Sequence, residues 1–277
     1  RLLLLKYPLL ERTGIVEHCF TTRLGGVSAD IFSTMNLSFT RGDEEAAVRE
    51  NYRRLARALG AEVGQFVCSD QTHTVNVRRV TAADAGKGLT RERDYRDVDG
   101  LITDEPGLVL STFYADCVPL YVVDPVHRAI GMSHSGWRGT AARMGAVTLS
   151  AMQEAYGTRP EDVVCAVGPS ICKDCYEVSA DVADIFAEEF PGHEQEILAE
   201  SEKNSVGMAH ADKKYQLDLW EINRRILLSA GILPCNLPSI SALLCIQKGV
   251  DLILCIFQTI SHAHLVAQDL VSHVQKQ

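Results

Sequence analysis

The segment from Asp99 to Pro125, DGLITDEPGLVLSTFYADCVPLYVVDP, most restricts what this chain can fold into. It contains strand-length apolar runs broken by a Glu105-Pro106-Gly107 turn, which predicts two or three strands, and 129–133 predicts another. Helix patterns over 43–60, 136–157 (with Thr140 as the candidate N-cap), 179–188 and 218–230 are mixed with the strands without a strict βαβα rhythm. We therefore expect an α/β or α+β sandwich with mixed sheets.

Composition limits the classes of function. The net charge of −9 disfavours nucleic acid as a partner, although a small phosphate-containing ligand could still bind in a locally positive pocket. The leucine run before Lys6 is too short for a membrane span or a signal peptide. Nine cysteines, an odd number, indicate a reducing compartment, so we expect a cytoplasmic protein. No repeat or linker divides the chain, which favours one domain over 1–277.

Three polar segments interrupt apolar strand patterns: SDQTHTVNV with His73, YADCVPLY with Cys117, and GMSHSGWRGT with His134. These residues are too far apart in the sequence to lie on one turn of a helix. Their spacing fits the ends of different strands that converge on one site. Two imidazoles and a thiolate are a natural ligand set for zinc with an open fourth position, and they also suit copper. Without a metal, Cys117 and a neighbouring His could form a nucleophile and base pair.

Other motifs are weaker. Cys172 and Cys175 form a C-x-x-C pair, but no second pair lies at the spacing of a structural zinc site, and the context is a loose match to a thioredoxin-like motif. The glycines of RLGGVS and SGWRGT lack the Walker A lysine and the dinucleotide-binding spacing, so they more simply permit tight turns.

Taken together, seven segments resemble one family. FTTRLGGVS, NLSFTRGDEEAAVRENYRRL, QTHTVNV, DGLITDEPGLVL, ADCVPLYVVDP, GMSHSGWRGT and GPSICKDCYEV occur in the order seen in the YfiH/YlmD-type family, over about Val16 to Val178. Members of this family were long labelled laccase-domain or multicopper polyphenol oxidases and are now regarded as purine nucleoside phosphorylases. The resemblance implies a central β-sandwich flanked by helices, similar to bacterial deamidating toxins that use a Cys-His pair.

The resemblance also implies a site and an activity. Its metal ligands correspond to His73, Cys117 and His134. The implied reactions are phosphorolysis of adenosine, inosine, guanosine and methylthioadenosine, and deamination of adenosine, with Zn²⁺ bound and phosphate as co-substrate. Asp116 is expected to orient a ligand, and the candidates for holding substrate or phosphate are Asn36, Arg41, Gln71, Asp116 and Arg138. We expect a monomer or small homo-oligomer that binds purine nucleosides and neither nucleic acid nor membrane.

The C-terminal segment departs from the family pattern from about residue 238. The expected arginine-rich motif is missing, and the chain instead reads PSISALLCIQKGVDLILCIFQTISHAHLVAQDLVSHVQKQ, in which His262-Ala263-His264 is expected to be solvated. Two alternatives stand beside the phosphorylase. One is a copper-dependent polyphenol oxidase, although three ligands cannot build several copper centres. The other is a nucleoside-binding module with impaired catalysis.

Overall fold

Two five-stranded sheets form the centre of the structure, a computed structural model that describes residues 1–237 and 253–259. The first sheet is antiparallel except for the parallel β3–β6 pair. In spatial order its strands are β1 (Leu4–Leu5), β2 (Val16–Thr21), β13 (Ile253–Thr259), β6 (Val109–Tyr114) and β3 (Phe66–Cys68). The second sheet is antiparallel except for the parallel β4–β5 pair. Its strands are β4 (Val77–Arg79), β5 (Gly100–Thr103), β8 (Ala129–Ser135), β7 (Val118–Asp124) and β9 (Val164–Val167).

The apolar run of β7 is explained by burial on both faces. Leu120 and Val122 point into a core shared with helices, whereas Tyr121 and Val123 point into the core between the two sheets. Because side chains alternate across a strand, a strand covered on both sides needs apolar residues at every position. The predicted sandwich with mixed sheets is therefore confirmed.

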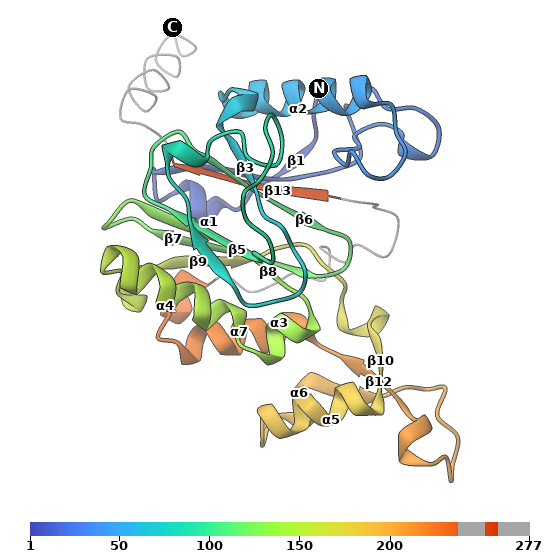
Figure 1. Ribbon diagram of the computed structural model, residues 1–277. Helices are drawn as coiled ribbons and strands as arrows, with labels where there is room; N and C mark the ends of the chain where they lie inside the picture. Colours follow the sequence, from blue (N-terminus) through green and yellow to red (C-terminus); the bar gives the residue numbers. More distant parts are fainter. Residues whose placement is uncertain (238–252, 260–277) are drawn as a thin grey trace, which may run out of the picture.

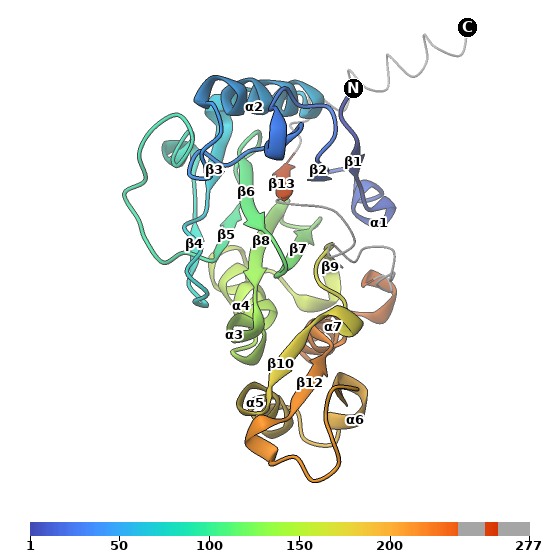
Figure 2. The same cartoon turned by 90° about the vertical axis from the view of Figure 1, so that its right-hand side faces the viewer.

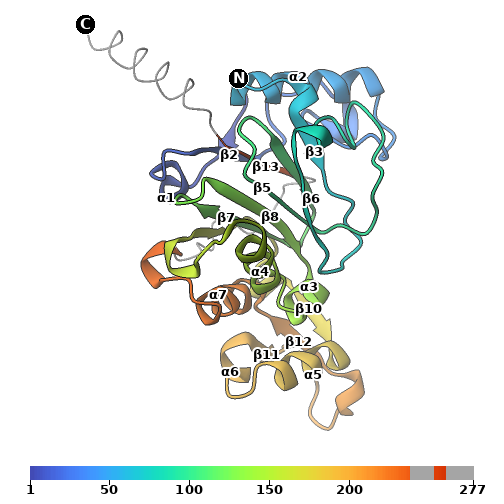
Figure 3. The ribbon, with the colours of Figure 1, turned by 60° about the vertical axis from the view of Figure 1, so that its left-hand side comes forward.

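Helices cover both outer faces of the sandwich, giving four layers (Figures 1 and 3). The first sheet is covered by α2 (Glu45–Leu59), whose buried face contains Val48, Tyr52 and Leu55. The second sheet is covered by α4 (Met144–Tyr156) and α7 (Leu219–Ser229). Two short helices complete this part, α1 (Pro8–Glu11) and α3 (Trp137–Ala141).

A smaller sheet lies beyond α3 and α7, at the end away from α2 (Figure 2). Its antiparallel strands are β10 (Glu177–Ser179), β12 (Lys214–Leu217) and β11 (Leu198–Glu200). The helices α5 (Ala180–Glu189) and α6 (Glu194–Ile197) pack beside it. No helix in residues 1–237 has both the length and the apolar character needed to cross a bilayer.

Most predicted helices are confirmed, but the one predicted over 136–157 is wrong in two respects. The segment forms two helices, because Arg143 adopts a left-handed conformation (φ 60°) between α3 and α4. Thr140 lies inside α3 and is not an N-cap; its hydroxyl instead bonds to Ser135 and Asn223. The atypical segment predicted from about 238 lies outside the described residues except for β13, and so does His262-Ala263-His264.

His18 is a buried histidine in the first sheet. Its ring has 0% exposure, stacks on Tyr7 and accepts a hydrogen bond at Nε2 from the Tyr7 main-chain N–H at 2.7 Å. Burial, together with the nearby Lys6 ammonium, lowers the pKa of His18 to about 4. The folded protein therefore holds this imidazole neutral, and acid must charge it.

The free energy of unfolding should consequently fall with acidification. Since the pKa of His18 is about 4 when folded and near 6.5 when unfolded, its contribution is intact above pH 6.5 and is lost as pH falls towards 4. Between pH 7.5 and pH 5 we expect a loss of about 2 kcal/mol from this residue. Urea unfolding of wild-type and His18→Gln protein at both pH values measures it. An equal pH dependence in the two proteins would contradict the assignment.

Candidate functional site

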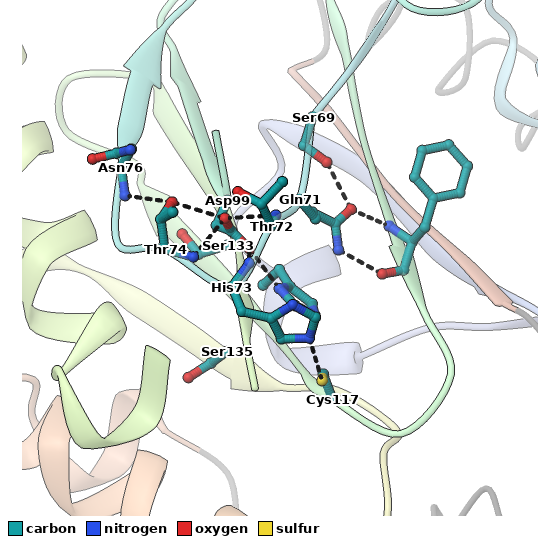
Figure 4. Close-up of polar contacts among 12 residues, drawn as sticks. Ser69, Gln71, Thr72, His73, Thr74, Asn76, Asp99, Cys117, Ser133 and Ser135 are labelled. Atoms are coloured by element: carbon teal, nitrogen blue, oxygen red, sulfur yellow. Dashed lines mark hydrogen bonds and ion pairs between the residues drawn. The ribbon is translucent and has the colours of Figure 1, made fainter. Parts of the chain in front are cut away.

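The side chains of His73, Cys117 and His134 meet at one end of the sandwich, as the sequence predicts. Their ligand atoms all lie within 4.8 Å of one another. His73 comes from the loop between β3 and β4, Cys117 from the turn between β6 and β7, and His134 from β8. Figure 4 shows the His73 ring pointing towards Cys117, with 3.9 Å between Nε2 and Sγ. No other such group of His, Cys, Asp or Glu occurs in the described part of the chain.

Strand pairing places His134 next to the Cys117 turn. In the β7–β8 pair, Pro119 lies opposite His134. Because Cys117 directly precedes β7, it is brought to the same end of the sheet as His134. His134 is buried, with 4% exposure, and its Nδ1 lies 2.8 Å from a carboxylate oxygen of Asp99. An ionised carboxylate only accepts hydrogen bonds, so Nδ1 carries the proton and the lone pair of Nε2 remains available to a metal.

Asp99 is the residue that organises the site, and motif analysis did not identify it. Its carboxylate has 0% exposure and accepts hydrogen bonds from His134 and from the main-chain N–H groups of Thr72, His73 and Thr74. Burial alone would raise the pKa of Asp99, but the hydrogen bonds from His134, Thr74 and Thr72 outweigh it and hold the pKa at about 2. The available sequence signal was an acid directly before the buried strand β5.

The loop that carries His73 is wrapped around this carboxylate. His73 has a φ of 66°, in the left-handed region that non-glycine residues seldom adopt. Such a conformation persists when the surroundings determine it, and here three consecutive N–H groups converge on Asp99. Burial and the neighbouring His134 lower the pKa of His73, so its ring is neutral near pH 7 and can act as a ligand.

The environment of Cys117 suits a metal ligand better than a free nucleophile. Burial first, and then the carboxylates of Asp116 and Asp99, raise the pKa of the Cys117 thiol to about 11. Reactive cysteines instead have a lowered pKa in an electropositive setting. A metal ion would remove this proton on binding and relieve the negative surroundings. This observation favours the metal alternative over the Cys-His nucleophile pair.

The separation of His73 and Cys117 is close to that of two ligands on a tetrahedral ion. With Zn–N near 2.0 Å and Zn–S near 2.3 Å, a tetrahedral site separates nitrogen from sulfur by about 3.5 Å. The His73–Cys117 separation of 3.9 Å is close to this value. Three protein ligands leave one position for water or substrate, the arrangement typical of catalytic zinc.

Gly136 is required by the crowding around these ligands. A Cβ atom at this position would lie 2.9 Å from Cys117 Sγ and 3.0 Å from His73 Cδ2. Behind it, Ser135 bonds to Thr140 at 2.9 Å and to Asn223 at 3.0 Å, which fastens the end of β8 to α3 and α7. The glycine preceding Trp137 thus serves close packing as well as a turn.

The predicted substrate-binding residues are only partly gathered at the site. Asp116 is exposed next to Cys117, and its side chain makes no hydrogen bond to the ligands among the described residues; Asp99 makes that contact instead. Arg138 is exposed over the Trp137 ring at 4.3 Å, and its charge acts on His73. Tyr176, which the sequence analysis did not single out, lies within electrostatic range of Cys117 and Arg138.

The other candidates have structural partners. Gln71 uses its side-chain amide to pair with the Phe113 main chain, at 2.6 and 2.7 Å, as a strand neighbour would (Figure 4). Asn36 is buried and contacts Ser38 and Asp43, near the start of α2. Arg41 is exposed in the same loop. Cys172 and Cys175 flank a short turn and do not join the three-residue group. Roles in substrate binding stay predictions for Asn36, Arg41, Gln71, Asp116 and Arg138.

Known proteins are similar to this chain in sequence and in fold. A family model described as "Multi-copper polyphenol oxidoreductase laccase" matches residues 17–243. The purine nucleoside phosphorylase YlmD of Bacillus subtilis (strain 168) is 36% identical over 77% of this chain and 73% of its own length. Adenosine deaminase RL5 of an unknown prokaryotic organism is 31% identical over 80% of this chain and 81% of its own. The crystal structure of the Bacillus licheniformis hypothetical protein YfiH superposes with a TM-score of 0.79 at 29% identity, covering 89% of this chain and 93% of that one.

Substituting Gly136 by Ala should separate the ligands. The new Cβ would contact Cys117 and His73 at about 3 Å, and overpacking of this kind costs about 1–3 kcal/mol. We expect metal affinity to fall about tenfold or more, measured by competition with a chromophoric chelator. Gly64→Ala is the matched control, because a Cβ there meets nothing within 4 Å. Equal affinities in the two variants would refute the packing argument.

Replacing Asp99 by Asn should disturb the ligands without removing one. An amide cannot accept all the hydrogen bonds that the carboxylate accepts, and its N–H₂ faces donors. Loss of such a supporting contact typically lowers metal affinity about 10–100-fold. The control is Asp116→Asn, for which we expect a change of about twofold at most, since this exposed carboxylate makes no bond to the ligands. The reverse ranking would show that Asp116 is the orienting residue.

Proposed function

The chain belongs to the multi-copper polyphenol oxidoreductase laccase family, and from this premise we propose that it is a zinc-dependent purine nucleoside phosphorylase with adenosine deaminase activity. The proposed substrates are adenosine, inosine, guanosine and methylthioadenosine, with inorganic phosphate as co-substrate. The observation that carries the proposal is the convergence of His73, Cys117 and His134 around the carboxylate of Asp99. Relatives named purine nucleoside phosphorylase and adenosine deaminase support nucleosides as the substrate class.

The proposed metal ligands are Nε2 of His73, Sγ of Cys117 and Nε2 of His134. When bound, zinc supplies Lewis acidity, which polarises an oxygen of water or phosphate. Asp99 has a positioning role: it holds the proton on Nδ1 of His134 and fixes the backbone of the His73 loop. Burial of His134 and Asp99 keeps water away from the supporting side of the site, so the hydrogen bonds there keep their strength.

Each reaction needs an anionic or polar nucleophile next to a nucleoside. Phosphorolysis breaks the bond between ribose C1′ and the purine nitrogen, forms a C1′–O bond to phosphate, and leaves a proton on the purine. Deamination replaces the exocyclic amine of adenosine with oxygen from water and releases ammonia. Arg138 is exposed beside His73 and is proposed to attract phosphate, since a guanidinium group binds phosphate oxygens through paired N–H groups.

Two other functions are compatible with the family. A copper-dependent polyphenol oxidase needs several metal centres, whereas the described residues hold a single three-residue group. A nucleoside-binding module with impaired catalysis would bind adenosine without converting it. We favour the phosphorylase, and we propose a cytoplasmic monomer or small homo-oligomer that binds neither nucleic acid nor membrane, in keeping with the net charge of −9.

Removal of one ligand should abolish turnover. We expect Cys117→Ala and His73→Ala to reduce phosphorolysis of inosine roughly 100-fold or more, because Lewis-acid polarisation contributes several kcal/mol. Cys235→Ala, at an exposed cysteine, is the control and should keep full activity. Hypoxanthine release is the measurement, and unchanged rates in both ligand variants would sink the assignment.

Products and metal content separate the alternatives. With adenosine, formation of adenine and ribose 1-phosphate only when phosphate is present reports phosphorolysis, and formation of inosine reports deamination. About one zinc per purified chain would agree with three ligands and an open position. Several copper ions per chain together with phenol oxidation would favour the oxidase, and adenosine binding without any product would favour the binding module.

A further inference from the structure

An arginine-lined cavity lies outside the three-residue group, on the segment that connects β3 to β5. Its volume is about 750 Å³, within the range of small-molecule sites. It is lined by residues 88–93 with Asp70, Tyr95 and Arg96. The lining therefore contains three arginines, Arg91, Arg93 and Arg96, and two acidic residues, Asp70 and Glu92. An excess of positive charge stands out on a chain whose net charge is −9.

Two of these arginines are held in place. Arg93 forms an ion pair with Asp70 at 2.6 Å and donates to the Ser69 carbonyl at 2.6 Å. Arg91 donates to the carbonyl of Ala83. A carbonyl positions a guanidinium group without neutralising it, so Arg91 keeps its full charge at the cavity. Preorganised donors of this kind bind an anion without a large loss of side-chain entropy.

Arg96 is the donor left for a ligand. It is exposed, and no hydrogen bond or ion pair links its side chain to another residue within 1–237. The five N–H groups of arginine match the geometry of phosphate oxygens. Arg96 follows Tyr95, which is buried and donates its hydroxyl to the Cys68 carbonyl at 2.6 Å, so the backbone that carries Arg96 is anchored on β3.

The loop that forms the other wall is tightly built. The Gly86 carbonyl accepts hydrogen bonds from the main-chain N–H groups of Leu89, Thr90 and Arg91. Gly88 has a φ of 84°, and a Cβ there would lie 2.8 Å from the Cβ of Cys68, so the loop packs directly on β3. The backbone of this wall is therefore a fixed part of the fold.

We propose that this cavity binds a phosphate group, with Arg96 and Arg91 as the recognising side chains. The ligand is either free orthophosphate or the phosphate of a nucleoside monophosphate. Phosphate suits two guanidinium groups better than a carboxylate does, because it offers more oxygen atoms to their paired N–H groups. This inference goes beyond the proposed function and does not depend on it.

The cavity also adjoins the loop that carries His73. Asp70 accepts a hydrogen bond from the Asp97 N–H at 3.2 Å, and Asp97 in turn accepts one from the Thr72 hydroxyl at 2.8 Å. Thr72 donates its N–H to Asp99. Asp70, which lines the cavity, is therefore linked to Asp99 by three hydrogen bonds that pass through Asp97 and Thr72.

Calorimetric titration of the full chain tests the proposal at low ionic strength. The probes are inorganic phosphate, adenosine 5′-monophosphate, adenosine and acetate, and the variants are Arg96→Gln and the control Arg12→Gln. Arg12 is an exposed residue that follows α1. In Figure 2, α1 lies on the opposite side of the sandwich from β4. We expect phosphate binding to weaken about tenfold or more in Arg96→Gln and to be unchanged in Arg12→Gln. Equal affinity for the two probes that carry phosphate identifies the free ion as ligand, and tighter binding of the monophosphate identifies the nucleotide.

Several outcomes would overturn it. The proposal is wrong if the wild-type protein does not bind phosphate, or if it binds phosphate and acetate equally. It is also wrong if adenosine and its monophosphate bind equally, or if the two arginine variants have equal affinity for phosphate. A Cys117→Ser protein separates this cavity from the proposed metal site. We expect it to keep phosphate binding, and loss of binding there would place the anion at the metal site instead. Far-ultraviolet circular dichroism checks that each variant is folded.

Discussion

The carboxylate of Asp99 is the interaction on which the site depends. Asp99 lies directly before β5 of the second sheet, and its carboxylate binds three main-chain N–H groups of the loop that follows β3 of the first sheet. The same oxygens fix the proton on Nδ1 of His134. A buried charge is tolerable only when its hydrogen-bonding capacity is satisfied. Here the donors include two of the three proposed ligands, His73 and His134, together with the neighbours of His73 in the chain, Thr72 and Thr74. The hydrogen bonds of the Asp99 carboxylate therefore stabilise this end of the sandwich and also position the proposed ligands for a metal.

Sequence patterns predicted the participants better than their arrangement. The residue types at His73, Cys117 and His134 indicated metal chemistry, and the apolar runs indicated strands. Asp99 could not be singled out, because an acid before a strand is common and its partners are fixed only by strand register. Gln71 shows the opposite case: a polar residue in a family motif pairs with the Phe113 backbone, which no spacing rule reveals.

The break between α3 and α4 was missed for a related reason. Apolar periodicity runs through the segment, and a left-handed arginine is invisible to a periodicity argument. The hydroxyl of Thr140 suggested a cap, but the tertiary structure uses it to join β8 to α7. The arginine-lined cavity likewise depends on a loop folding back onto β3. Sequence periodicity thus predicted helices and strands, whereas contacts between them determined which side chains meet at the proposed sites.

The position of β13 has a consequence for how the protein is made. The strands that form the second sheet, β4, β5, β7, β8 and β9, lie within residues 77–167, so this sheet can assemble early during vectorial synthesis. The first sheet cannot assemble early, because β13 (Ile253–Thr259) lies between β2 and β6 and pairs with each of them. Until that strand leaves the ribosome, the nascent chain exposes two unpaired strand edges, which are sites of aggregation and of chaperone capture.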